Sequence, residues 1–138
     1  MKLKSLEDTK NFSENFSKII NKGDIIFLYG EIGTGKTTFA RFFINHLESE
    51  NKIKNSDILS PTFNIVYDYA VGKIKILHYD LYRLKNIKEL EELDFFENLN
   101  NNITFIEWPE ILIGLPLNNN HYLINIDMIS ETKRKINI

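Results

Sequence analysis

The chain has no cysteine, and this absence excludes several kinds of chemistry at once. Disulfide frameworks, thiolate zinc sites and cysteine nucleophiles all need a residue type that none of the 138 positions provides. Arginine is also scarce, because only Arg41, Arg83 and Arg134 stand among the 17 basic residues. Functions that depend on many bidentate clamps for phosphate or carboxylate groups are therefore poorly served.

The net charge and the hydrophobic content of the chain are both moderate. The 17 basic and 19 acidic residues give a net charge of −2, so the basic field typical of nucleic-acid-binding domains is missing. No apolar run approaches the roughly 20 residues that span a membrane, and the N-terminus turns polar before any apolar core of signal length. With 43% hydrophobic residues, the sequence predicts one globular domain over residues 1–138 in the cytoplasm, without a membrane partner.

Hydrophobic periodicity predicts alternating helices and strands. Ser5 with Asp8 three positions later resembles a capping box, and apolar residues at helical spacing follow over 6–21. The continuous apolar run at 25–29 suits a buried strand, and helical spacing returns over 36–49. The remaining expected elements are strands at 63–69 and 73–79 joined by an Ala-Val-Gly turn, helices at 87–93 and near Phe95, and strands at 103–106, 122–128 and 133–138.

The segment between the first strand and the second long helix carries the most specific motif. Gly30-Glu-Ile-Gly33-Thr34-Gly35-Lys36-Thr37 has four residues between its first glycine and Gly-Lys-Thr, which is the phosphate-loop pattern. Glycines let successive backbone N–H groups turn toward one anion, and the helix that follows adds its N-terminal dipole. We expect Lys36 to reach the β- and γ-phosphates of a nucleotide and Thr37 to ligate Mg²⁺.

Around this loop, the expected elements form a single three-layer α/β domain of the P-loop NTPase class. Its sheet is expected to be mostly parallel, with antiparallel hairpins near 63–79 and 121–138. Such proteins need a further acid near Mg²⁺, usually at the C-terminal end of a neighbouring strand. Glu107 directly follows one expected strand, and Asp80 follows another within a few residues. The pattern leaves open which of the two orients water, and a solvated carboxylate is the alternative for each.

Three further residues have open interpretations. The strand position of His78 is as consistent with a packed or hydrogen-bonded role as with a role in the site. Trp108, beside Glu107, suits either the core or a partner contact. Arg83 suits an arginine finger in cis or, more simply, a structural pair with a neighbouring acid.

Four blocks in a fixed order give the chain a resemblance to a known family. The phosphate loop through Thr38 is followed by Ser60-Pro-Thr-Phe63, His78-Tyr-Asp-Leu-Tyr-Arg83 and Ile106-Glu-Trp-Pro109. This succession resembles the bacterial TsaE family, the ATPase subunit of the machinery that makes threonylcarbamoyladenosine in tRNA. The loop departs from the family pattern at Ile32 and Thr34, and neither change removes a required glycine.

The resemblance implies the ligands, the partners and the roles of individual residues. ATP and Mg²⁺ would bind, and hydrolysis by the subunit alone would be weak. The partners would be homologues of TsaB and TsaD, of which TsaD modifies the adenosine beside the anticodon, so that tRNA contact with this chain is indirect. The implied nucleotide-binding residues are Gly33, Thr34, Gly35, Lys36, Thr37 and Thr38, with Thr9 and Arg134 bordering the adenine. The implied catalytic residues are Lys36, Asp80 and Glu107, the implied metal ligands are Thr37, Glu107 and Asp80, and Thr62 would be a switch-like γ-phosphate sensor.

Two other functions share the phosphate loop. A small nucleoside or metabolite kinase must bury an acceptor and normally closes an arginine-rich lid over the phosphates. About 100 residues after the loop and three arginines leave little room for either. A non-catalytic binding module would use ATP only to order the Ser60–Phe63 loop. Phosphate transfer to a small acceptor would identify the kinase, and substitution of Glu107 separates the module from the ATPase.

Overall fold

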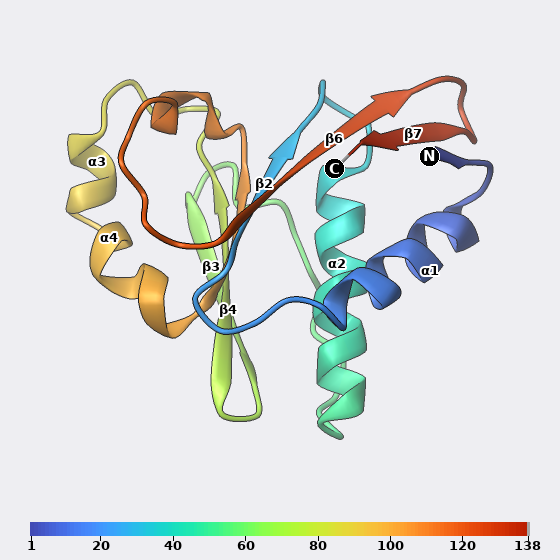
Figure 1. The fold of residues 1–138 in the computed structure, drawn as a ribbon, viewed down its shortest axis with the longest axis horizontal. Coiled ribbons are helices and arrows are strands. Elements are labelled where there is room, and N and C mark those ends of the chain that lie inside the picture. The colour runs from blue at the N-terminus through green and yellow to red at the C-terminus, as the bar shows by residue number, and fades with distance from the viewer. Residues whose placement is uncertain (138) are drawn as a thin grey trace.

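The computed structural model describes residues 1–137 and has three layers, in which a seven-stranded sheet lies between two groups of helices (Figure 1). Helices α1 and α2 cover one face of the sheet, and α3 and α4 lie on the other side. In chain order the elements are β1 (Lys2–Leu3), α1 (Leu6–Ser17), β2 (Ile25–Tyr29), α2 (Lys36–Glu50), β3 (Val66–Val71), β4 (Ile74–Asp80), α3 (Lys88–Glu91), α4 (Phe95–Asn98), a 3₁₀ turn (Leu99–Asn101), β5 (Ile103–Glu107), a second 3₁₀ turn (Pro109–Leu112), β6 (His121–Met128) and β7 (Arg134–Asn137).

The sheet has the strand order β1-β7-β6-β2-β5-β4-β3. Its inner strands β6, β2, β5 and β4 run parallel to one another, whereas β1, β7 and β3 are antiparallel to their neighbours. The predicted fold class is therefore confirmed, including the two hairpins, β3–β4 and β6–β7. The short strand β1 was not predicted, because two residues are too few to show a hydrophobic alternation.

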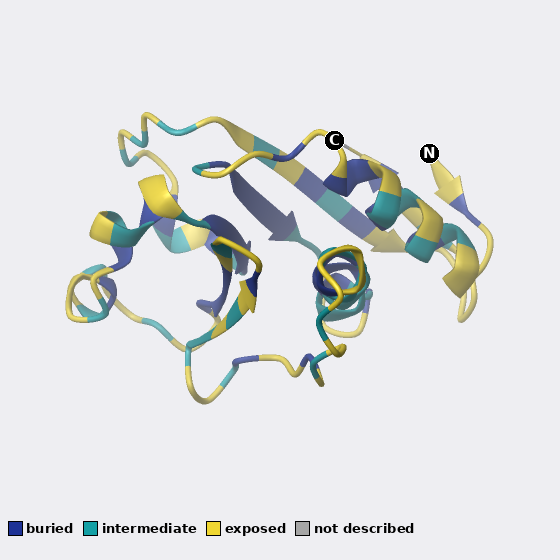
Figure 2. Cartoon of the chain, turned by 90° about the horizontal axis from the view of Figure 1, so that it is seen from below, coloured by how far each residue is buried: buried dark blue, intermediate teal, exposed yellow. Residues whose placement is uncertain are grey.

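Strand β2 contributes side chains to two separate cores, since successive residues of a strand point to opposite faces. Ile26 and Leu28 pack with α1 and α2, while Ile25 and Phe27 belong to the core beneath α3 and α4. Figure 2 shows buried residues gathered along the inner strands and on the helix faces turned toward them. Burial on both faces explains the uninterrupted apolar run that this strand has in the sequence.

Several element boundaries differ from the predicted ones because turns interrupt the hydrophobic pattern. Helix α1 ends at Ser17 instead of near residue 21, since the next N–H groups bond to carbonyls three residues back. Strand β3 begins at Val66 instead of at 63, after Ile65 adopts a φ of 69°. The hairpin turn lies at Gly72, whose φ is 70°, because β3 continues through the alanine and valine that were predicted to form the turn.

The second half of the chain shows smaller shifts. The predicted helix at 87–93 is shortened to α3, and Asp94, with a φ of 54°, separates it from α4. Strand β5 extends one residue further than predicted and ends on Glu107. The predicted strand at 133–138 is β7, and its last predicted residue, 138, lies outside the described residues. None of the helices within residues 1–137 is long and apolar enough to cross a membrane.

Burial of the Tyr79 ring makes the stability of the folded chain fall at alkaline pH. Tyr79 is 1% exposed and packs edge-on against Phe95, with ring centres 5.0 Å apart. Burial raises the pKa of Tyr79 to about 12 from its ordinary value of 10.0. The unfolded chain therefore loses this proton at a lower pH than the folded chain, so stability falls as pH rises from the unfolded pKa through the folded pKa. Below the unfolded pKa this contribution to stability is complete.

We expect Tyr79→Phe to lose about 2 kcal/mol less unfolding free energy than the parent chain between about pH 9 and about pH 11.5. Denaturant unfolding at the two pH values measures this difference. Tyr82→Phe, at a residue that is 55% exposed, is the matched control and should follow the parent chain. An equal alkaline loss in the parent chain and Tyr79→Phe would contradict the prediction.

Candidate functional site

The phosphate loop joins the C-terminal end of β2 to the N-terminus of α2. Gly30, Gly33 and Gly35 have φ values of 149°, 82° and 108°, which favour glycine. Space is also restricted at Gly30, where an added Cβ would lie 2.6 Å from the carbonyl oxygen of Ile126. Gly35 is the N-cap of α2 and offers no side chain to the first N–H groups of the helix. These N–H groups are therefore left for an anion.

Lys36 folds back over the loop that precedes it. Its Nζ donates to the carbonyl oxygens of Gly30, at 2.5 Å, and Glu31, at 3.0 Å, and lies 4.2 Å from the centre of the Trp108 ring. Burial lowers the pKa of Lys36, and nearby carboxylates, of which Glu107 has the largest effect, oppose this shift. The structure thus places the amine at the loop, within reach of carbonyl groups that a phosphate could replace.

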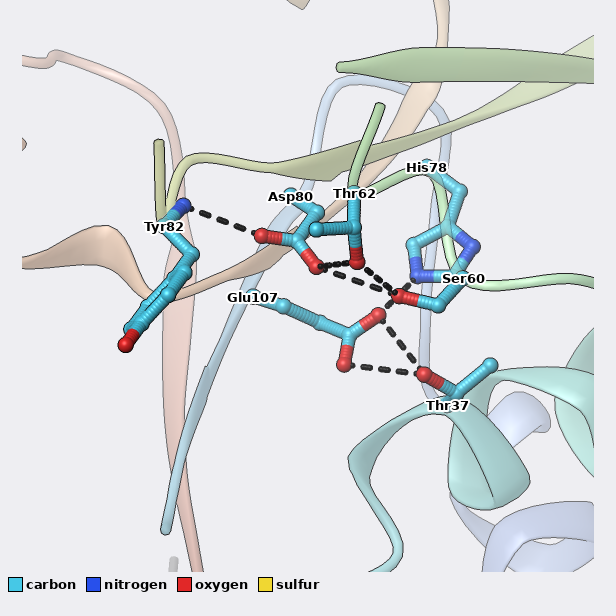
Figure 3. A network of polar contacts seen from close by, with 7 residues as sticks. All are labelled: Thr37, Ser60, Thr62, His78, Asp80, Tyr82 and Glu107. Atoms are coloured by element: carbon cyan, nitrogen blue, oxygen red, sulfur yellow. Dashed lines mark hydrogen bonds and ion pairs between the residues drawn. The ribbon is translucent and has the colours of Figure 1, made fainter. Parts of the chain in front are cut away.

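Asp80 and Glu107 lie side by side at the ends of adjacent parallel strands. Their Cα atoms are paired in the register between β4 and β5, and the two residues are 4% and 3% exposed. The hydroxyl of Thr37, in the first turn of α2, lies 3.0 Å from each carboxylate oxygen of Glu107 (Figure 3). The structure therefore brings together the three residues that were expected to lie at the metal.

The carboxylate of Asp80 holds the loop that precedes β3. Its Oδ2 accepts hydrogen bonds from the hydroxyls of Ser60, at 3.1 Å, and Thr62, at 3.0 Å, while Oδ1 accepts one from the N–H of Tyr82 at 2.9 Å (Figure 3). Thr62 was expected near the γ-phosphate, whereas no role was predicted for Ser60. The Ser-Pro-Thr-Phe block, with two hydroxyls two positions apart, was the available signal for it.

The other end of this loop is fixed at the far end of α2. Glu48, in the last turn of the helix, is 1% exposed. It accepts hydrogen bonds from the amide of Asn45 at 2.9 Å and from the N–H and hydroxyl of Ser56 at 3.0 and 2.5 Å. Ile58 is buried in the core on the α1 and α2 side of the sheet. One helix therefore carries Thr37 at its first turn and an anchor of the Ser60–Thr62 segment at its last.

The interpretation of His78 is settled by its contact with Glu107. The imidazole is fully buried, and its Nε2 lies 2.6 Å from Oε2 of Glu107 (Figure 3). His78 is therefore hydrogen-bonded within the candidate site. The sequence left this possibility open but provided no signal for the partner.

Trp108 and Arg83 both differ from the simplest expectation. Trp108 is half-buried, adopts a φ of 56° and lies 4.9 Å from the ring of Tyr82, so it borders the site and does not belong to the core. The guanidinium of Arg83 lies 4.9 Å from the ring centre of Phe63. In the described part of the chain it forms no ion pair, so the expected pairing with an acid is wrong. Its contact is instead the exposed ring of Phe63, in the loop before β3.

Two hollows adjoin the phosphate loop. The larger, about 520 Å³, brings Thr9 of α1 and Arg134 of β7 together with Thr34, Gly35 and Thr38. Nε of Arg134 donates to the carbonyl oxygen of Thr34 at 2.8 Å. The lining of the smaller hollow, about 210 Å³, consists of Gly33, Gly35, Lys36, Thr37, Thr38 and Glu107. Because the two hollows share Gly35 and Thr38, a nucleotide base in the larger one could have its phosphates in the smaller one.

The donor set is compatible with Mg²⁺ held jointly by protein and phosphate. Across residues 1–137, no group of three or more His, Cys, Asp or Glu residues is arranged to hold a metal. Mg²⁺ usually takes one or two carboxylates together with substrate phosphates, so an all-protein cage is not required. The Thr37 hydroxyl donates its proton to Glu107 and keeps its lone pairs available for a cation.

A buried strand, a glycine-rich loop and a helix on a three-layer sheet define an α/β protein of the P-loop class. The sequence model of the family "Threonylcarbamoyl adenosine biosynthesis protein TsaE" matches residues 3–136. The chain belongs to the TsaE family.

Individual relatives agree with this assignment. The tRNA threonylcarbamoyladenosine biosynthesis protein TsaE of Rickettsia prowazekii (strain Madrid E) is 40% identical over 139 residues, which cover 99% of this chain and 91% of the relative. The protein of the same name from Aquifex aeolicus (strain VF5) is 34% identical over 137 residues, with 99% and 92% coverage. A crystal structure of Bacillus subtilis YdiB has a TM-score of 0.71 at 24% identity and covers 99% of this chain and 80% of that one, which supports the fold. Family membership places the chain in tRNA threonylcarbamoyladenosine biosynthesis.

Proposed function

We propose that this chain binds ATP with Mg²⁺ and hydrolyses the ATP, as a subunit that supports threonylcarbamoyladenosine formation in tRNA together with homologues of TsaB and TsaD. The proposal rests on one arrangement: Thr37, at the start of the helix that follows the phosphate loop, is hydrogen-bonded to Glu107, with Asp80 on the next strand. A glycine turn with an incidental lysine would not need two buried carboxylates at the same end of the sheet.

The residues have distinct tasks in this proposal. The N–H groups of the loop and Nζ of Lys36 hold the phosphates, and Thr37 with Glu107 and Asp80 holds Mg²⁺, which supplies positive charge to the phosphoryl group during transfer. Water attacks the γ-phosphorus in line and gives up a proton to a carboxylate, the bond to the bridging oxygen breaks, and ADP and phosphate are released. The hydroxyls of Ser60 and Thr62 and the N–H of Tyr82 already engage both carboxylate oxygens of Asp80. Among the described residues, Oε1 of Glu107 accepts only the Thr37 hydroxyl, which turns to Mg²⁺ in this proposal. We therefore assign the orientation of the attacking water to Glu107.

The positions of the arginines support the proposal that the isolated chain hydrolyses ATP only weakly. Arg41 and Arg83 lie over the rings of Phe42 and Phe63, and Arg134 lines the larger hollow. No arginine lines the smaller hollow at Lys36, as far as the described residues extend. A partner that supplied an arginine or ordered the loop would stabilise the negative charge of the transition state, for which this chain provides no arginine in the described part of the smaller hollow.

The test is to measure phosphate release from ATP by the chain alone and with purified TsaB and TsaD homologues. We expect the complete mixture to be faster by at least about tenfold, since an arginine supplied in trans accelerates hydrolysis by several orders of magnitude in related enzymes. The two homologues without this chain give the background rate. Equal rates with and without the partners would contradict the proposed dependence on the complex.

A further inference from the structure

The imidazole of His78 and the carboxylate of Glu107 form a buried pair beneath the candidate site. We propose that His78 is a positioning residue that fixes which oxygen of Glu107 faces the nucleotide, an inference that rests on the proposed ATPase function. His78 lies on β4, whereas Glu107 ends β5, the neighbouring parallel strand. The pair therefore joins the two strands whose ends carry the predicted metal ligands.

The contact has a defined direction. A carboxylate offers only acceptor sites, so Nε2 of His78 carries the proton and donates it to Oε2 of Glu107 across 2.6 Å. The two residues are 0% and 3% exposed, so water does not compete strongly for this bond. Figure 3 shows the imidazole and the Thr37 hydroxyl on different sides of the Glu107 carboxylate.

Thr37 alone does not orient this carboxylate. Its hydroxyl is 3.0 Å from both Oε1 and Oε2 of Glu107, so its contacts do not distinguish the two oxygens. His78 removes that equivalence by engaging Oε2, which leaves Oε1 as the oxygen available to a ligand or a water molecule. His78 is also independent of the phosphate loop, so its hold on Glu107 persists when the Thr37 hydroxyl turns toward a bound cation.

Packing does not explain why this position holds an imidazole. Nδ1 of His78 is buried without a hydrogen-bond partner in the part of the chain that the structure describes. A buried polar nitrogen without a partner lowers stability, which an apolar side chain at the same place would avoid. The bond to Glu107 is the interaction that only the imidazole provides here.

The experiment compares His78→Leu, which removes the donor, with His78→Gln, which restores an N–H group. His46→Gln is the matched control, because His46 is half-buried on α2 and pairs with Glu50 at 3.1 Å, away from the loop. The kcat and KM for ATP are measured with TsaB and TsaD homologues present. Nucleotide affinity with and without Mg²⁺ is measured from the fluorescence of Trp108, the only tryptophan.

In His78→Leu we expect kcat to fall by about 10- to 100-fold, as is typical when a residue that orients a metal-site ligand is removed. The affinity without Mg²⁺ should stay unchanged, whereas the tightening of nucleotide binding by Mg²⁺ should weaken, so that KM measured with Mg²⁺ rises by no more than this weakening. His78→Gln should recover most of the lost kcat, and His46→Gln should match the parent chain. A lower kcat and a weaker effect of Mg²⁺ at an unchanged Mg²⁺-free affinity are not expected of a residue that only packs.

Two results would overturn the role of His78. One is an unchanged kcat in His78→Leu, and the other is an equal loss of kcat and of Mg²⁺-free affinity together with a lower unfolding temperature. If the parent chain with its partners hydrolyses no ATP, the proposed function fails separately. In that case, the Mg²⁺ dependence of nucleotide binding tests the positioning role of His78. The same Mg²⁺ dependence in the parent chain and in His78→Leu would refute that role.

Discussion

Glu107→Gln is expected to lower the rate of ATP hydrolysis by about 10²- to 10⁴-fold while nucleotide binding persists, because an amide cannot take a proton from the attacking water. Glutamine keeps the volume of the buried side chain and an acceptor for the Thr37 hydroxyl, which Glu107 now engages at 3.0 Å. Phosphate release in a single turnover with the partner proteins present measures the rate. The fluorescence of Trp108, which is half-buried at the phosphate loop, reports binding.

The matched control for this experiment is Glu110→Gln, which makes the same change in charge three residues further on, at an exposed position. Hydrolysis by that variant should equal that of the parent chain. An unchanged rate in Glu107→Gln would show that another group orients the water. Should tRNA modification survive in Glu107→Gln while hydrolysis is lost, the chain would instead be a nucleotide-gated binding module.

Lys36→Met is expected to weaken ATP binding by about 10- to 150-fold, which corresponds to the loss of a charged hydrogen bond to phosphate. The methionine keeps the apolar stem beside Trp108 but removes the ammonium that now donates to the carbonyl oxygens of Gly30 and Glu31. Calorimetric titration is the suitable measurement, because the loss of a cation 4.2 Å from the Trp108 ring would itself change the fluorescence.

Lys22→Met provides the comparison for general charge effects, since Lys22 is exposed before β2. Its ATP affinity should equal that of the parent chain. The unfolding free energy of Lys36→Met should be measured in parallel, because two loop carbonyl groups lose their donor. A folded Lys36→Met with undiminished affinity would show that phosphate does not bind at this loop.

The parts of the site that could be predicted are those formed by residues close together in the sequence. The phosphate loop needs only consecutive residues and a strand before it, and Glu107 directly follows an apolar run. The pairing of Asp80 with Glu107 depends instead on β4 lying beside β5. Hydrophobic periodicity defines which face of a strand is buried but contains no information about the order of strands in a sheet.

Contacts between segments that are distant in the sequence could not be predicted for the same reason. Thr9 and Arg134 lie near opposite ends of the chain, and only the folded structure brings them to one hollow. Before the structure was known, only the family resemblance could link them. Glu48 looks like an ordinary solvated residue of an amphipathic helix, and only the fold shows it buried against Ser56. The partner of His78 is hidden in the same way, since 29 positions separate it from Glu107.

The two anchors of the loop before β3 set how far it can travel. Ser56 is tied to Glu48 and Ile58 to the core, while the carbonyl of Ile65 accepts the N–H of Asp80 at 2.8 Å. The segment 59–64 between them can span at most about 20 Å when fully extended. Because the segment is short, its hydroxyls can move away from Asp80 only through a local change in loop conformation. In the proposed complex, a partner that contacts these hydroxyls would therefore have to approach this edge of the sheet, because the loop is too short to extend toward it.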